Sequence, residues 1–349
     1  MQQFQYLDKG ILILIGSLLI TVLLSWFSLF LAPLINLMDD PKSADHKKHI
    51  KVIPLTGGLV FSTTLLILII LTGLWKDNNI WAIFVSGLFI ASVGLLDDFI
   101  HLTPIQKFSG QLIGAIFLIF NGVQVNIFDS PDFFYSTDSN LDTILNISFT
   151  LLWLLALTNA FNFIDSIDGL VVGLSGVSTI FFFISTLITG QHQLFLLCAI
   201  VLGICVGLYF FNSHPAKLFL GDSGAQTLGF ILASIAIVYD PSRGFQSSTW
   251  FVPILIFYMP LFDLLLVIIS RLKRKKRIYK AARDHTYHRL EQKGISIHHA
   301  VLIIHGVSLV MSMIGYLCLS LSVFSANFIF IFAVILGLLA FIKLDKNYN

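Results

Sequence analysis

Residues 149–170 read FTLLWLLALTNAFNFIDSIDGL, so a strongly apolar run continues directly into two amides and two carboxylates. The apolar part is typical of a membrane-spanning segment. An aspartate within a bilayer costs roughly 2.5–3.5 kcal/mol on insertion scales. Asp165 and Asp168 must therefore lie outside the hydrocarbon or serve a function that offsets this cost.

The composition of the whole chain agrees with a membrane location. Of its 349 residues, 56% are hydrophobic and only 11% are charged, and the mean hydropathy is +0.89. Soluble domains carry roughly 25% charged residues. The apolar runs are long and do not alternate with a period of two, which favours helices over a barrel. The three cysteines all lie in apolar segments and have no metal or disulfide spacing.

We predict an all-α integral membrane protein with eleven transmembrane helices, forming one polytopic membrane domain over residues 1–349. The first apolar run is too long for a signal peptide and is read as a retained helix. The helices are expected at about 10–37, 55–75, 80–96, 109–127, 144–163, 170–189, 194–213, 224–240, 249–270, 299–320 and 324–343.

The basic residues predict the orientation of these helices. With eleven spans, the connecting loops alternate between the two sides of the membrane. Of the 21 basic residues, only Lys9, Lys76 and Arg243 fall on the side of the N-terminus. Because cytoplasmic loops are enriched in lysine and arginine, the N-terminus is expected outside and the C-terminus in the cytoplasm. The polar end of the opening stretch then lies at the cytoplasmic face.

A first polar cluster ends the third predicted helix. Asp97 and Asp98 are adjacent, and Lys107 follows ten residues after Asp97. Two carboxylates in a low-dielectric rim repel each other unless a cation lies nearby. The pair is either a solvated helix end with a snorkelling lysine, or a base- or metal-carrying pair in which Lys107 binds a phosphate.

The opening stretch is the second cluster. On a helix, Asn159, Asn162 and Asp165 share one face, and Asp168 lies a turn beyond. These oxygen-rich side chains suit a hard cation such as Mg²⁺ rather than zinc. Asp168 has a simpler alternative, because it could cap the N-terminus of the sixth helix.

Two further clusters are weaker by themselves. Asp222 lies in the segment Gly221 to Gly224, before an apolar helix whose N-terminal amides can bind an anion, although Asp222 or Ser223 could equally be a plain N-cap. Lys47 and His49 lie in a basic loop before the second helix, which would otherwise pass for an ordinary cytoplasmic loop.

The last cytoplasmic loop is strongly basic. The run Lys273 to Arg277 fits an anchor that meets anionic lipid headgroups. His285, His288 and Arg289 follow it in a compact polar turn and suit a nucleotide diphosphate. Asp284 is expected to pair with Arg283 or Arg289. Asp263, within the ninth helix, could be a structural partner for a nearby cation or a functional residue.

Taken in order, these clusters resemble the polyprenyl-phosphate N-acetylhexosamine-1-phosphate transferases, the MraY/WecA/TagO family, from Asp40 to about His299. The matching motifs are P-x-x-G-G at 54–58, D-D at 97–98 with P-x-x-K at 104–107, N-x-x-N-x-x-D-x-x-D-G-L at 159–170, P-A-K-x-F-x-G-D-x-G at 215–224 and a His-rich loop ending H-R-L at 288–290. Ser166 stands where the family usually has glycine, and Tyr287 where relatives often have a third histidine. The resemblance is closer to the WecA/TagO branch.

The resemblance implies transfer of a sugar 1-phosphate, most simply N-acetylglucosamine 1-phosphate, from a UDP-sugar to undecaprenyl phosphate at the bacterial inner membrane, with release of UMP. It implies Mg²⁺, with Mn²⁺ as the alternative, bound by Asp165. Asp97 or Asp98 would orient the acceptor phosphate or take its proton. The substrate-binding residues would be Lys47, His49, Lys107, Asn159, Asn162, Asp168, Asp222, His285, His288 and Arg289.

Two other classes of protein remain as alternatives. A transporter would carry acids through the depth of the bilayer, whereas here, apart from Asp263, the acids assigned to spans lie at cytoplasmic ends. A degenerate family member acting as a scaffold would not need its motif acids and lysine intact. The expected partners are the two substrates and the lipid bilayer, with no nucleic acid. The sequence leaves a homodimer, the sugar and the polymer pathway open.

Overall fold

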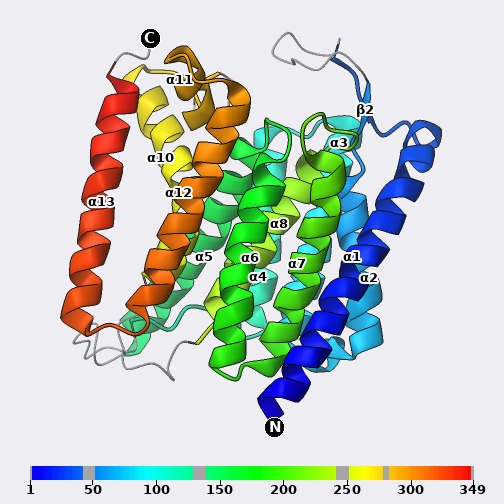
Figure 1. The fold of residues 1–349 in the computed structure, drawn as a ribbon, viewed down its shortest axis with the longest axis horizontal. Coiled ribbons are helices and arrows are strands. Elements are labelled where there is room, and N and C mark those ends of the chain that lie inside the picture. Colours follow the sequence, from blue (N-terminus) through cyan, green and yellow to red (C-terminus); the bar gives the residue numbers. More distant parts are fainter. Residues whose placement is uncertain (1, 42–51, 129–138, 241–250, 278–282, 347–349) are drawn as a thin grey trace. The chain divides into compact units, whose positions relative to one another are not determined.

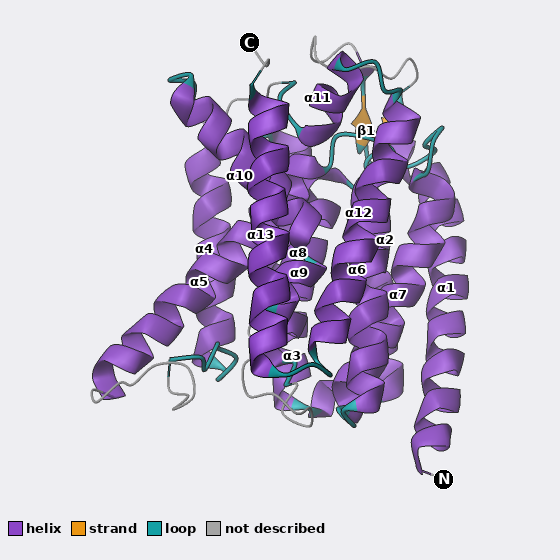
Figure 2. Cartoon of the chain, turned by 60° about the vertical axis from the view of Figure 1, so that its left-hand side comes forward, coloured by secondary structure: helices purple, strands orange, loops and turns teal. Residues whose placement is uncertain are grey.

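The structure is a computed structural model that describes residues 2–41, 52–128, 139–240, 251–277 and 283–346. It is an all-α integral membrane protein, because apolar helices make up nearly all of the regular structure that is described (Figures 1 and 2). The chain forms two compact units, Met1–Pro241 and Ser242–Asn349.

The first unit is a helical bundle. Its helices are α1 (Gln2–Leu34), α2 (Gly57–Thr72), the short 3-10 turn η2 (Leu74–Lys76), α3 (Asn78–Ile100), α4 (Pro104–Phe120), α5 (Ser139–Ile164), α6 (Leu170–Ile188), α7 (His192–Asn212) and α8 (Gly221–Val238). Helix α7 packs between α1 and α6, and α8 packs against α3 and α5 (Figure 1). Both α7 and α8 are buried over most of their length, as expected of helices that are apolar all round.

One end of this bundle is held together by backbone pairing. Strand β1 (Met38–Asp39) pairs antiparallel with β2 (Ile53–Pro54), and Figure 2 shows β1 at the end of the helices. The chain after β2 then pairs with the segment before α8: Phe219 N–H donates to Pro54 O at 2.8 Å, and Gly57 N–H donates to Phe219 O at 2.9 Å. The starts of α2 and α8 are thereby fixed to each other.

The second unit contains the helices that follow residue 251. They are α9 (Val252–Ile256), α10 (Tyr258–Lys273), α11 (Thr286–Gln292), α12 (Ile297–Cys318) and α13 (Val323–Asp345). Sequence analysis predicts one helix over 249–270, but the structure breaks it at Phe257. Pro260 is the reason, because proline has no N–H to donate to Ile256 O and its ring clashes with that carbonyl.

Each of the eleven predicted segments overlaps a helix in the described part of the chain, although α4 starts and ends several residues earlier than the predicted 109–127. Among the described residues, eight helices are long and apolar enough to cross a bilayer, namely α1, α3, α5, α6, α7, α8, α12 and α13, while α2 and α4 are shorter apolar helices. The number of spans, their orientation and the single-domain organisation stay predictions. Helix α11 has no counterpart among the predicted segments, because its seven residues are too few for an apolar period.

Candidate active site

Lys107 is the centre of a charged cluster in the first unit. Its amine donates to Asp222 Oδ2 at 2.6 Å and also pairs with Asp97 Oδ2. The three side chains come from α4, α8 and α3, and Lys107 and Asp222 are 115 residues apart in the sequence. Asp97 is buried, while Lys107 and Asp222 are about 30% exposed. The cluster is therefore reachable from outside the protein.

A rigid turn between α3 and α4 sets the position of Lys107. Asp97 Oδ1 accepts the Leu102 N–H at 2.6 Å and so fixes the end of α3. Thr103 then starts α4 with a capping box, in which Thr103 N–H donates to Gln106 Oε1 at 2.9 Å and Thr103 Oγ1 accepts from Gln106 N–H. Pro104 occupies the first helical turn, where its missing N–H has no cost. Lys107 follows directly on this turn.

Asp98 caps a helix other than its own. Its two carboxylate oxygens accept the N–H groups of Asp222 at 2.8 Å and Ser223 at 3.1 Å, at the start of α8. The N-cap residue of α8 is Leu220, which has no side-chain acceptor, so neither Asp222 nor Ser223 is the N-cap. Gly221 has a φ of 69°, and a Cβ there would lie 2.7 Å from Asp98 Oδ2. Asp98 thus fixes the backbone that carries Asp222.

Asp165 lies in the loop between α5 and α6 and is half-buried. Burial raises the pKa of Asp165 well above its usual range, and the charges of Asp222, Asp98 and Asp168 raise it further. Four carboxylates therefore act on one another, while Lys107 is the lysine paired within the group. This excess of negative charge suits a bound divalent cation.

The residues present fit Mg²⁺ as an ion shared with a substrate. Among the described residues, no three His, Cys, Asp or Glu side chains form a ready-made metal cluster. Mg²⁺ commonly takes one or two carboxylates together with water and substrate phosphates rather than an all-protein cage. Asp165 as the metal ligand stays a prediction, and its surroundings agree with that role.

Asp168 tethers two loops. Its Oδ2 accepts from His214 Nδ1 at 2.9 Å and from Ala216 N–H at 3.1 Å. The alternative that Asp168 caps α6 is not what the structure shows, because the N-cap residue is Gly169 and it has no side-chain cap. Gly169 N–H donates instead to Asn212 Oδ1 at 3.1 Å. Asp168 thereby helps to hold the loop that leads to Asp222.

Three amides form a polar layer one helical turn further into the bundle. Asn159 Nδ2 donates to Gln111 Oε1 at 2.7 Å, and Gln111 Nε2 donates to Gln226 Oε1 at 3.0 Å. Gln111 is four residues after Lys107 on α4, and Gln226 is four residues after Asp222 on α8. Each amide therefore lies one helical turn further along the same face of its helix than the charged residue. Asn159 is thus bound to other amides, and Asn162 lies half-buried one turn nearer Asp165. Sequence reasoning missed both glutamines because a lone glutamine in an apolar helix carries no motif.

The glycines at 57 and 58 allow α2 to approach α8 closely. A Cβ at Gly58 would lie 2.4 Å from Gly224 N, and one at Gly57 would lie 2.7 Å from Leu220 Cα. This close packing explains the P-x-x-G-G motif physically. The predicted substrate-binding residues Lys47 and His49 lie outside the described residues, and their roles stay predictions.

In the second unit, the predicted histidine turn is organised by Asp263. Asp263 Oδ2 lies 2.7 Å from His285 Nδ1, and Asp263 Oδ1 accepts the Thr286 N–H at 2.6 Å. Asp263 is fully buried, so these two bonds satisfy its carboxylate and fix the start of α11. The geometry agrees with the structural alternative for Asp263 rather than with an acid on an ion path.

Arg289 lies in an internal network of the same unit. Its Nε donates to Asp284 O at 2.9 Å and its Nη1 donates to Asp345 Oδ1 at 2.9 Å. The bidentate partner of Asp284 is Arg271, with both bonds at 2.7 Å, so the expected pairing of Asp284 with Arg283 or Arg289 was wrong for its carboxylate. Burial alone would raise the pKa of Asp284, but the hydrogen bonds and charge of Arg271 hold it below its usual range.

Of the basic run that precedes this turn, two residues form ion pairs and a third is exposed. Lys273 and Arg274, predicted as part of a lipid anchor, pair with Asp345 at 3.2 and 3.0 Å. Lys275 is exposed. His288 is buried and packs on Tyr287 with ring centroids 4.0 Å apart. Contact of His285, His288 and Arg289 with a nucleotide sugar stays a prediction.

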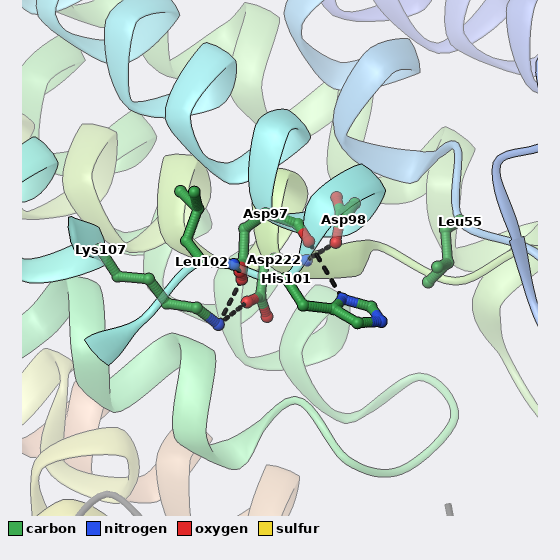
Figure 3. Close-up of a pocket in the computed structure, with 7 residues that line it drawn as sticks. All are labelled: Leu55, Asp97, Asp98, His101, Leu102, Lys107 and Asp222. Atoms are coloured by element: carbon green, nitrogen blue, oxygen red, sulfur yellow. Dashed lines mark hydrogen bonds and ion pairs between the residues drawn. The ribbon is translucent and has the colours of Figure 1, made fainter. Parts of the chain in front are cut away.

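The charged cluster of the first unit opens into a pocket of about 260 Å³. Its lining, drawn in Figure 3, consists of Leu55, Asp97, Asp98, His101, Leu102, Lys107 and Asp222. Four of these residues were predicted site residues. His101 was missed, although it lies between two predicted ones, because a single histidine at a helix end usually has no function.

Comparison with known proteins identifies similar sequences. Residues 80–240 match the family described as Glycosyl transferase family 4. The chain is 30% identical over 326 residues to the "Probable undecaprenyl-phosphate N-acetylglucosaminyl 1-phosphate transferase" of Bacillus subtilis (strain 168), which covers 92% of this chain and 88% of that protein. It is 28% identical over 283 residues to the "Decaprenyl-phosphate N-acetylglucosaminephosphotransferase" of Mycobacterium leprae (strain TN), covering 74% and 71%. It is 32% identical over 250 residues to the "Phospho-N-acetylmuramoyl-pentapeptide-transferase" of Enterococcus hirae, covering 66% and 74%.

Proposed function

The chain belongs to glycosyl transferase family 4, and from that membership we propose that it transfers a sugar 1-phosphate from a UDP-sugar to a polyprenyl phosphate. Two of the relatives named above, those of Bacillus subtilis and Mycobacterium leprae, are named for undecaprenyl phosphate and decaprenyl phosphate, which supports a lipid phosphate as the acceptor. Most simply, N-acetylglucosamine 1-phosphate passes to undecaprenyl phosphate and UMP is released, in cell-envelope polymer synthesis at the inner membrane of a bacterium.

The observation that carries this proposal is the pocket around Lys107. Transfer of a phosphosugar brings two anions together, so the enzyme must neutralise charge and hold both reactants in position. The Lys107 amine is held between Asp97 and Asp222 and lines the pocket with them. A phosphate entering the pocket can compete with these carboxylates for the amine, which keeps the lysine charged and in place until substrate arrives.

The carboxylates of the site are expected to have different roles in the transfer. Asp165 would bind Mg²⁺, or Mn²⁺ in its place, and the bound ion would neutralise charge on the pyrophosphate and on the departing UMP. Asp98 positions Asp222 through the two backbone N–H groups that it accepts. Asp97, which lines the pocket beside Lys107, would orient the acceptor phosphate or take its proton. His285, His288 and Arg289 remain candidates for the UDP-sugar, and a homodimer stays open.

The decisive experiment measures UMP release by the purified protein. Undecaprenyl phosphate and a panel of UDP-sugars are supplied with Mg²⁺, and the lipid product is identified by mass spectrometry. Lys107→Ala should lower kcat/KM at least about a hundredfold, since charged hydrogen bonds contribute roughly 1.5–3 kcal/mol each. Lys9→Ala, which changes an exposed lysine of α1, is the matched control and should leave the rate unchanged. A folded protein that releases no UMP with any UDP-sugar and polyprenyl phosphate would refute the proposal.

A further inference from the structure

His101 is a pocket residue that the roles above leave unused. It follows the last residue of α3 and lines the pocket together with Asp97, Asp98, Lys107 and Asp222. Figure 3 shows its imidazole beside the carboxylates, on the side toward Leu55. Its side chain is exposed, so a substrate in the pocket can reach it.

The backbone at His101 has a conformation that side chains rarely adopt. Its φ is 53° and its ψ is 83°, in the left-handed region, where glycine or asparagine would fit more easily. A residue kept in this region costs free energy that the surrounding contacts must offset, and such residues cluster at functional sites. The position itself ends α3, because His101 N–H donates to Asp97 O at 2.9 Å. A helix end needs only the backbone, so the conformation does not by itself explain the imidazole.

One ring nitrogen of His101 is occupied and the other is available. Nδ1 lies 3.3 Å from Asp97 O, within reach of a hydrogen bond that would fix the ring plane. When Nδ1 donates to that carbonyl, Nε2 is an acceptor in the neutral ring and a donor in the protonated ring. The contact with Asp97 O therefore leaves Nε2 as the atom that can bind a ligand.

The charges around the ring indicate which ligand this is. Three carboxylates and one lysine line the pocket with His101, and the Lys107 amine is already paired with Asp97 and Asp222. An incoming phosphate therefore meets more negative than positive charge. An imidazole that carries a proton on both ring nitrogens donates through each of them, and it would add a second positive charge beside Lys107 when an anion binds.

We propose that His101 binds a phosphate oxygen of a substrate through Nε2. The inference rests on the proposed function, because it assigns a residue to the same pocket. The oxygen belongs either to the lipid phosphate or to the pyrophosphate of the UDP-sugar, and both present the same chemistry. His101 thus supplies a second cationic contact, beside Lys107, that forms only when the anion is present.

The test replaces the imidazole without disturbing the backbone. His101→Asn is the main variant, because asparagine tolerates positive φ and cannot carry the charge. Its kcat/KM should fall about ten- to a hundredfold for one of the two substrates, and varying each substrate in turn shows which one. His101→Lys should retain more activity than His101→Asn, since Lys275 shows that this chain accommodates a lysine at a φ of 54°. If His101→Asn is not recovered folded, His101→Gly, which relieves the strain, takes its place.

Lys275→Asn is the matched control, because it makes the same replacement at an exposed left-handed residue outside the pocket. It should leave both kcat/KM values within twofold of wild type. The inference is overturned if His101→Asn also stays within fivefold for both substrates, or if the Lys and Asn variants lose activity equally. Failure of the wild-type protein to release UMP would instead refute the proposed function, so the two failures are distinguishable.

Discussion

The two units treat their charged residues differently. In the described part of the first unit, Asp97 and Asp222 share Lys107 at a pocket that Asp98 also lines. The charges of Asp222 and Asp98 also act on Asp165. In the second, Asp263, Asp284 and Asp345 each have a basic partner within 2.9 Å. Paired opposite charges stabilise a structure, whereas an excess of one sign is stabilised by a bound counter-ion. The comparison therefore separates a cluster whose excess of negative charge suits a cation from a set of paired charges that holds helices together.

Acid should affect the two regions in opposite directions. The pKa of Asp165 is raised, so its ionised form costs stability above that pKa, and the cost disappears as pH falls. The pKa of Asp284 is lowered, so its ionised form contributes stability above about pH 4, and this contribution is lost as pH falls further.

The largest expected effect is the loss of all turnover when divalent cations are removed. EDTA should abolish UMP release, and Mg²⁺ or Mn²⁺ should restore it. Mg²⁺ should also raise the Tm near neutral pH, and by less as the pH falls, because protons compete for Asp165. Turnover that continues unchanged in excess EDTA would contradict the assignment of a metal to the first unit.

Next in size is the replacement Asp165→Asn, which removes a charge with little change of volume. The kcat/KM should fall about a thousandfold, which corresponds to about 4 kcal/mol of transition-state stabilisation. The Tm should stay equal or rise, because one of several mutually repelling carboxylates is gone. Asp8→Asn, at an exposed position of α1, serves as the control and should change neither quantity. Near-normal activity of the Asp165 variant would show that the excess of acid is not functional.

In the second unit, breaking the pair of Arg271 and Asp284 should lower stability rather than catalytic activity. Arg271→Ala leaves the buried carboxylate of Asp284 without its bidentate partner, which costs about 3 kcal/mol of unfolding free energy. Chemical or thermal unfolding at neutral pH measures this loss. The double variant with Asp284→Ala should lose less than the sum of the two single changes. Additive losses would mean that the two side chains are not coupled.

The smallest informative effect comes from Arg289→Ala. It removes contacts with Asp284 O and Asp345, and should lower the Tm and also reduce kcat/KM for the UDP-sugar about ten- to a hundredfold. Lys275→Ala, at an exposed position in the same loop, should change almost nothing. Equal damage by the two changes would mean that the loop acts as one diffuse basic surface.

Much of the fold could be predicted from the sequence because the bilayer imposes long apolar helices. The break at Phe257 could not, since the apolar run continues through it and only Pro260 interrupts the hydrogen bonding. Helix α11 was likewise invisible, because its start depends on Asp263, which lies 23 residues earlier in the chain. Features that depend on contacts distant in sequence leave no period to detect.

The sequence predicts which residues form the site, but it does not predict the hydrogen bonds between them. The motifs indicate which acids and which lysine gather at one end of the bundle. They do not indicate that Asp98 caps α8, that Asp168 tethers the His214 loop, or that amides support Lys107 and Asp222 from below. Each of these contacts joins different helices or loops, so only the folded arrangement of α3, α4, α5 and α8 shows them.

The cap that Asp98 provides for α8 also determines when the pocket can form during synthesis of the chain. Asp98 and Asp222 are separated by 124 residues, and synthesis proceeds at about 5–20 residues per second, so roughly 6–25 s pass between their appearances at the ribosome. During that interval α3 and α4 exist without the segment that completes the pocket. The centre of the first unit is thus assembled only when its final helix arrives, and a chain interrupted before residue 222 has inserted helices but no pocket.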